Sequence, residues 1–179
     1  ILVEATAVNG APLIYSSQGD SSTAAIQEAD SGLTAYGTLT VSDGDVTEEV
    51  TLSIDSASIS QTSSTRLNAF SEDTLKGFFS ITPTLVIDSS ATEGTLTWSF
   101  DSGTENFDEL EASETAVISY TVKATDQQGN TSTKTVDVTL TGTNDKPTIV
   151  APSGALKTAV EDTSIELTFA EILSSTTAA

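Results

Sequence analysis

The residues of this chain whose types and spacing most clearly suggest chemistry are Asn144 and Asp145, in a stretch that ends at Pro147. Asn and Asp side chains bind hard cations through oxygen, and proline stiffens the exit from a turn. A similar stretch lies near the N-terminus, where the same spacing of 135 residues separates Asn9 from Asn144 and Pro12 from Pro147. The recurring junction predicts binding of a divalent cation such as Ca²⁺.

The recurrence continues beyond the junction. Residues 25–28, which end in Glu28, match residues 159–161, which end in Glu161, at a spacing of 133 residues. Self-similarity at a fixed period predicts a tandem array. We therefore expect residues 1–11 to end a preceding repeat and its linker, residues 12–146 to form one complete unit, and residues 147–179 to begin the following repeat.

Acidic side chains gather at predicted loop ends, and calcium takes about six to eight oxygens from such loops. We expect one group at the first junction (Asn9, Glu28, Asp30), one around a predicted Asp43-Gly44 hairpin, and one that clamps neighbouring units (Asp126, Asn144, Asp145, Glu161). The predicted metal ligands are Glu28, Asp30, Asp43, Asp45, Asp126, Asn144, Asp145, Glu161 and Asp162. The alternative for each acid alone is a solvated turn residue.

The charge balance excludes several partners. The chain has 26 acidic and 6 basic side chains, for a net charge of −20. We expect no nucleic-acid partner, which would need clusters of Lys and Arg, and an anionic membrane surface would repel the chain. The acidity also fits simple solubility or halophilic adaptation. No stretch of 18 apolar residues predicts membrane insertion.

The chain contains no Cys, His or Met, so zinc, haem, iron–sulfur and copper sites lack their usual ligands, and disulfides are impossible. A secreted domain without disulfides often uses calcium as a staple. Nucleophile–base pairs of the usual kinds are also missing, so we expect no enzyme. A pair of carboxylates that hydrolyses a glycosidic bond is a distant alternative.

Strict alternation of apolar with Ser or Thr residues predicts strands over residues 38–42, 50–54, 95–100, 116–124 and 136–140. Shorter strands are expected at 79–81 and 85–87, with turns at 43–44 and 127–130 and after residue 101. About seven strands with one wet face each predict an all-β fold, an antiparallel two-sheet sandwich of the immunoglobulin or cadherin type.

Four features need the structure to interpret them. Residues 107–111 are compatible with a helical turn, and Tyr120 with a corner tyrosine that anchors its strand through the hydroxyl. Trp98 lies on the apolar face of its strand, which favours the core over a sugar-binding platform. Residues 55–77 are long for a strand connection, which leaves a functional loop and a disordered one both open.

The chain resembles the VCBS-type repeats, which are cadherin-like modules of large bacterial RTX surface adhesins. The resemblance is carried by residues 37–43, 107–110, 119–126, Gly129 and the tail at 138–147, which contains the specific series Thr-Gly-Thr-Asn-Asp-Lys-Pro. It implies a β-sandwich, calcium at the junctions, type I secretion and adhesion or biofilm formation. By analogy, Glu28, Asp126, Asn144, Asp145 and Glu161 fall where such modules hold calcium.

The chain departs from the family pattern at three places. Gly10 stands where Asp145 stands in the second junction, residues 55–77 are longer than a repeat needs, and Gln127 and Gln128 replace the second acid of the Asp126 turn.

The function expected from these observations is that of an extender module in a calcium-dependent adhesin on a bacterial cell surface. We expect the module to be extracellular and monomeric, with neighbouring repeats of its own chain as partners. The alternative is a module that binds a surface glycan or protein ligand through residues 55–77 or the Trp98 region.

Overall fold

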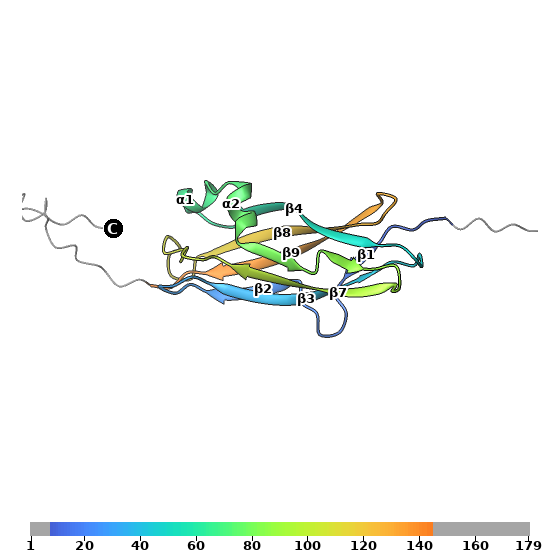
Figure 1. The fold of residues 1–179 in the computed structure, drawn as a ribbon. Helices are drawn as coiled ribbons and strands as arrows, with labels where there is room; N and C mark the ends of the chain where they lie inside the picture. Colours follow the sequence, from blue (N-terminus) through green and yellow to red (C-terminus); the bar gives the residue numbers. More distant parts are fainter. Residues whose placement is uncertain (1–7, 145–179) are drawn as a thin grey trace, which may run out of the picture. The chain divides into compact units, whose positions relative to one another are not determined.

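The computed structural model describes residues 8–144, and the predicted flanking repeats therefore lie largely outside the described residues. Nine strands form two sheets that face each other (Figure 1). The strands are β1 (Leu13–Tyr15), β2 (Thr23–Gln27), β3 (Thr34–Ser42), β4 (Val50–Ser60), β5 (Phe79–Thr82), β6 (Leu85–Ile87), β7 (Glu93–Asp101), β8 (Thr115–Thr125) and β9 (Thr131–Thr141). Two short helices, α1 (Thr65–Asn68) and α2 (Glu72–Gly77), follow β4.

The four-stranded sheet has the order β1-β3-β7-β5, and the five-stranded sheet has the order β2-β9-β8-β4-β6. Every pairing is antiparallel except that of β2 with β9, which is parallel. The first two strands therefore belong to different sheets: β1 pairs with β3 in one sheet, and β2 pairs with β9 in the other. This arrangement confirms the predicted all-β sandwich of the immunoglobulin type, with one parallel pair that was not expected.

Alternation along the strands builds the core. On β8 every second residue from Ala116 to Ala124 is buried, and β9 buries Val136, Val138 and Leu140 in the same way. The opposite sheet contributes Leu39, Leu96, Trp98 and Phe100. Because side chains in a strand point alternately to the two faces, the Thr and Ser residues between these positions face outward.

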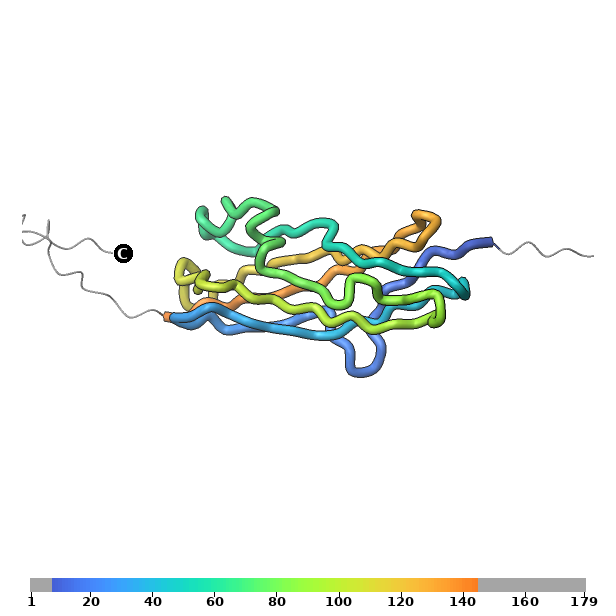
Figure 2. The backbone as a smooth tube through the Cα atoms, viewed as in Figure 1, coloured from blue at the N-terminus to red at the C-terminus, as the bar shows by residue number. Residues whose placement is uncertain are grey.

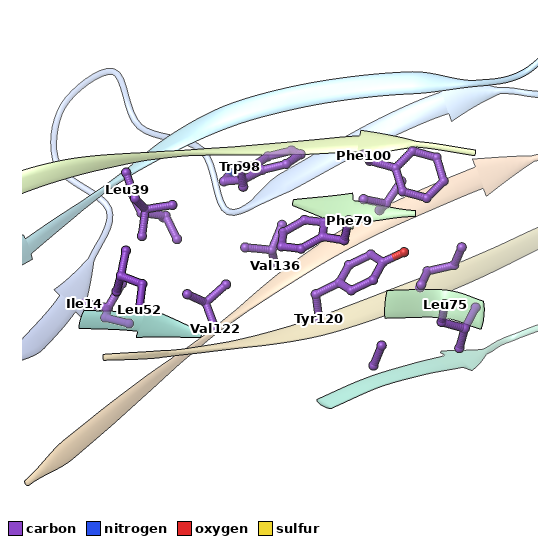
Figure 3. Packing of buried hydrophobic residues seen from close by; sticks show 14 of the residues in the cluster. Ile14, Leu39, Leu52, Leu75, Phe79, Trp98, Phe100, Tyr120, Val122 and Val136 are labelled. Carbon is purple, nitrogen blue, oxygen red and sulfur yellow. The ribbon is translucent and has the colours of Figure 1, made fainter. Parts of the chain in front are cut away.

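Aromatic rings join the two sheets at the centre of the core (Figure 3). The rings of Phe79 and Tyr120 stack with centroids 4.1 Å apart, and Phe79 also stacks on Trp98 at 6.0 Å. Trp98 is fully buried, and its indole N–H donates to the Ser21 carbonyl at 2.7 Å. The prediction that Trp98 belongs to the core is confirmed, so Trp98 cannot serve as a sugar-binding platform.

Tyr120 does not act as a corner tyrosine. Its side chain is fully buried, and its hydroxyl has no hydrogen-bond partner among the described residues. Burial raises the pKa of this hydroxyl above the ordinary tyrosine value. Tyr120 therefore contributes ring packing and no anchoring hydrogen bond.

The expected Asp43-Gly44 hairpin is wrong. The two strands on either side, β3 and β4, belong to different sheets, so residues 43–49 form a loop that crosses between sheets. The alternation of both strands is real, but it does not reveal which strands pair. The hairpin at residues 127–130 is confirmed: β8 pairs with β9, and the Gly129 N–H donates to the Asp126 carbonyl at 3.2 Å.

Residues 55–77 are ordered, and they fold in two parts. The strand β4 continues to Ser60, well beyond the predicted residue 54. The helices α1 and α2 then begin at the caps Ser64 and Ser71 and bury Leu67 and Leu75 against the sandwich. Each cap hydroxyl accepts a backbone N–H that would otherwise lack an intrahelical partner.

Residues 107–111 form a turn and not a helix. The Leu110 N–H donates to the Phe107 carbonyl at 3.0 Å, and Phe107 has a φ of 64°. Both Phe107 and Leu110 are buried, so core packing holds the turn in place.

Candidate metal centre

Three segments that are far apart in the sequence meet at one end of the sandwich, which we call the entry end. They are residues 8–12 of the N-terminal linker, the crossing loop 43–49 between β3 and β4, and the turn 126–130 between β8 and β9 (Figure 2). The Asn9 side-chain amide donates to Asp126 Oδ2 at 2.8 Å, and the Gly10 N–H donates to Asp45 Oδ2 at 2.6 Å. The entry end therefore joins the linker to both sheets.

Three carboxylates converge there. Asp43, Glu48 and Asp126 each present an oxygen, and these oxygens lie within 4.8 Å of one another. At an effective dielectric constant near 20, two unit charges about 5 Å apart repel by roughly 3 kcal/mol. No Lys or Arg in the part of the chain that the structure describes forms an ion pair with the three acids.

Asp43 is the most informative member of the cluster, because only 3% of its surface is exposed. Its Oδ1 accepts the Asp45 N–H at 3.1 Å. Its Oδ2 is enclosed and has no hydrogen-bond partner among residues 8–144. A buried carboxylate oxygen without a donor costs free energy, so the geometry favours an additional cationic partner.

Glu48 lies half-buried beside Asp43, and its Oε2 is also enclosed without a hydrogen-bond partner within the described range. Burial raises the pKa of Glu48, and the negative charges of Asp45, Asp126 and Asp43 raise it further, against the opposing effect of a hydrogen bond from Gln128. The charges of these three acids disfavour another negative charge at Glu48, and a bound cation would offset them.

Asp126 is held rigidly at the end of β8. Its Oδ1 accepts the Asn130 N–H at 2.7 Å, and its Oδ2 accepts the side-chain amides of Asn130 and Asn9, each at 2.8 Å. Burial opposes ionisation, but these hydrogen bonds outweigh it and lower the pKa of Asp126. The lowered pKa keeps Asp126 charged, so this residue contributes a negative charge to the cluster.

The donor set at the entry end consists only of oxygen. Asp43, Asp45, Glu48 and Asp126 supply carboxylates, and Asn9 and Gln128 supply amides nearby. Hard cations with flexible coordination, above all Ca²⁺, suit oxygen ligands gathered from several loops, whereas zinc and copper sites usually include nitrogen or sulfur. The residues present therefore fit calcium.

The other predicted ligands lie elsewhere. Glu28 is buried at the opposite end, which we call the exit end, where its Oε2 accepts the Thr143 N–H at 2.9 Å. Asp30 and Asn144 are exposed at the same end. Asp145, Glu161 and Asp162 lie outside the described residues.

Two predicted groupings are therefore wrong. Asn9 cannot share an ion with Glu28 and Asp30, and Asp126 cannot share one with Asn144 of the same unit. The strand β9 runs for 11 residues between the two ends, which corresponds to about 35 Å at the rise of an antiparallel strand.

Asn9, which matches Asn144 at a spacing of 135 residues in the sequence, contacts Asp126. The described linker, residues 8–12, therefore meets Asp126 at the entry end.

Sequence reasoning missed Glu48. The available signal was the density of acids at residues 43–49, which contain Asp43, Asp45, Glu48 and Glu49. A tight hairpin at residues 43–44 would have placed Glu48 on the next strand and not in the turn. Glu48 was therefore not considered as a ligand together with Asp43 and Asp45.

Several acids at the exit end, in contrast, have protein donors for their carboxylates. Glu114 accepts Ser63 N–H, Ser63 Oγ and Glu111 N–H, and these bonds lower its pKa to about 2. Arg66 pairs with Glu105 and Glu109 at 2.5 and 2.6 Å. Acidity alone therefore does not distinguish the entry end, whereas the convergence of three carboxylates does so among the described residues.

No protein-family model and no curated protein matches the sequence. Among solved structures, the chain is similar to the PapD-like domain 7 of human CEP192, with a TM-score of 0.44 and 10% identity over 82% of this chain and 96% of that one. It is also similar to the SrpA adhesin of Streptococcus sanguinis, with a TM-score of 0.43 and 14% identity over 83% of this chain and 66% of that one.

The CooA pilin subunit of enterotoxigenic Escherichia coli gives a TM-score of 0.40 and 12% identity over 76% of this chain and all (100%) of that one. Within residues 8–144, no helix is long and apolar enough to cross a membrane.

Proposed function

We propose that the chain is a structural module of a calcium-dependent bacterial surface adhesin of the VCBS type, exported by type I secretion. The observation that carries the proposal is the Asp43–Glu48–Asp126 cluster, placed where the preceding linker enters and bonded to Asn9 of that linker. The role is mechanical and not enzymatic. The recurrence of the linker sequence supports an array of such units.

The mechanism follows from the elements that the acids join. Asp43 directly follows β3 of the four-stranded sheet, and Asp126 directly follows β8 of the five-stranded sheet. One ion bound by both carboxylates would therefore link the two sheets. Asn9 and Gly10 connect the linker to the same cluster. Bound calcium would therefore fix the direction in which the linker enters, and its removal would leave repelling carboxylates that loosen the entry end.

Thermal unfolding with CaCl₂ and with chelator tests this function. We expect calcium to raise the melting midpoint, because a ligand that binds only the folded state at 100 times its Kd adds about 2.7 kcal/mol. The Asp43→Asn variant should lose most of this response, since Asp43 contributes the enclosed Oδ2.

Asp73→Asn is the matched control. It removes the same charge from an exposed position in α2, far from the cluster in sequence and on another element, and it should keep the full response to calcium. Equal midpoints of the unsubstituted protein in calcium and in chelator would refute the proposed function.

A further inference from the structure

The two linkers of the chain share an Asn and a Pro, and they differ in the two residues that lie between this Asn and this Pro. The first reads Asn9-Gly10-Ala11-Pro12, and the second has Asp145-Lys146 in place of Gly10-Ala11. We propose that position 10 sets the calcium affinity of the junction, so that Gly10 makes this entry site a weaker one than an Asn-Asp linker would complete. The inference rests on the proposed metal site and adds to it a residue that determines affinity.

The structure shows that Gly10 is not required by the backbone. Its φ lies outside the left-handed region, and a Cβ added to it would meet only Asp45 Oδ2, at 3.5 Å, an ordinary van der Waals contact. An L-residue therefore fits at position 10 without strain. The backbone conformation therefore does not explain why position 10 is a glycine. The remaining explanation is the chemistry that a side chain would add at this position.

The position of the missing side chain connects it to the cluster. The Cβ of a residue at position 10 would lie beside the carboxylate of Asp45, which already accepts the Gly10 N–H at 2.6 Å. Asp45 in turn adds to the negative field at Glu48, together with Asp43 and Asp126. An aspartate at position 10 would thus bring one more carboxylate to the same group of acids.

The site has a second indication of a ligand besides its acidity. Asp43 is 97% buried, given its exposed fraction of 3%, and its Oδ2 has no donor within residues 8–144. An added carboxylate at position 10 would have opposite effects in two states. It would supply another oxygen when calcium is bound, and it would increase repulsion when calcium is absent.

Calcium affinity in oxygen sites is tuned by the number of charged ligands. A junction closed by Asn-Gly would therefore fill at higher calcium concentrations than one closed by Asn-Asp. Along an array, such differences would make neighbouring junctions stiffen at different calcium concentrations.

Isothermal titration calorimetry with CaCl₂ on the full 179-residue chain tests the inference. Gly10→Asp should bind calcium about 10-fold more tightly than the unsubstituted protein, as expected for one more charged ligand. The same variant should melt at a lower temperature in chelator. Gly10→Asn, which matches the size without the charge, should stay within about 2-fold of the unsubstituted affinity.

Two further variants assign the effect to this site. The gain should vanish in Gly10→Asp combined with Asp43→Asn, because the cluster would be incomplete. Ala11→Lys, which installs the other difference between the linkers, should not tighten binding. An unchanged affinity of Gly10→Asp, or an equal gain in Gly10→Asn, would overturn the inference and leave the proposed function intact. Absence of calcium binding by the unsubstituted protein would overturn both.

Discussion

At the scale of single residues, the environment of a polar atom separates roles that the sequence leaves together. Asp43 and Glu114 are both acids at strand ends, yet Glu114 has four protein donors and Asp43 Oδ2 has none among the described residues. Sequence alone identified Asp43, Asp45 and Asp126 as candidates because acids next to turn residues suggest oxygen ligands. It could not show which of them lose contact with water.

Tyr120 gives a testable case of an enclosed polar atom. Its hydroxyl is buried without a partner in the described part of the chain, and such a group costs about 1–3 kcal/mol. Tyr120→Phe keeps the stacked ring and removes the hydroxyl, so we expect the free energy of unfolding to rise by about 1 kcal/mol. Urea denaturation at neutral pH measures the change.

Tyr36→Phe is the control for this prediction, because Tyr36 is 82% exposed and its hydroxyl faces water. Its stability should change by less than about 0.5 kcal/mol. A clear loss of stability in Tyr120→Phe would mean that the hydroxyl is hydrogen-bonded in solution.

At the scale of elements, the sequence predicted strands better than it predicted their partners. The long alternating runs became β7, β8 and β9 because each has one face in the core. The short strands β1 and β2 were missed: three residues are too few for a period, and the Ala residues of β2 give weak contrast. The crossing of residues 43–49 between sheets depends on contacts distant in sequence, which local patterns do not contain.

The segment between β1 and β2, where the chain changes sheets, depends on Asp20. The carboxylate of Asp20 accepts Thr38 Oγ1 at 2.5 Å, Thr40 Oγ1 at 2.7 Å, and both N–H and Oγ of Ser17 at 3.0 Å. Burial alone would raise its pKa, but these four hydrogen bonds lower it to about 2 from 3.8. The bonds that attach the segment to β3 are therefore strongest while Asp20 is ionised.

The depressed pKa predicts how stability changes with pH. A carboxyl group with a lower pKa in the folded state stabilises the fold above the unfolded pKa near 4, and this contribution is lost as the pH falls towards 2. Asp20→Asn should cost about 2 kcal/mol at pH 7 and little at pH 2. Urea denaturation at the two pH values gives the difference, and an equal cost at both would contradict the ionic role of Asp20.

At the scale of the whole molecule, the described chain enters the sandwich at one end and leaves it at the other. Asn9 contacts Asp126 at the entry end, whereas Thr143 contacts Glu28 at the exit end. Entry at one end and exit at the other would suit a unit of the proposed linear array. The repeat spacing in the sequence predicts that array, and the structure shows which acids the described linker meets, namely Asp126 and Asp45.

The net charge of −20 makes a further prediction about the whole molecule. Without calcium, repulsion among carboxylates opposes folding, and salt screens it: the Debye length falls from about 14 Å at 0.05 M to about 4 Å at 0.5 M ionic strength. We expect the melting midpoint in chelator to rise by about 3 °C or more between these NaCl concentrations. With saturating calcium the same change of salt should have a smaller effect, because a cation bound as we propose would neutralise the entry cluster.

The Asp43→Asn variant separates the cluster from the general charge. In chelator, it should melt above the unsubstituted protein at low salt and show a weaker dependence on NaCl, since one of three converging charges is gone. Asp73→Asn, at an exposed position of α2, should keep the full dependence. If the two variants respond identically to salt, the repulsion is spread over the surface, and the entry cluster is not the place where charge limits the stability of the metal-free module.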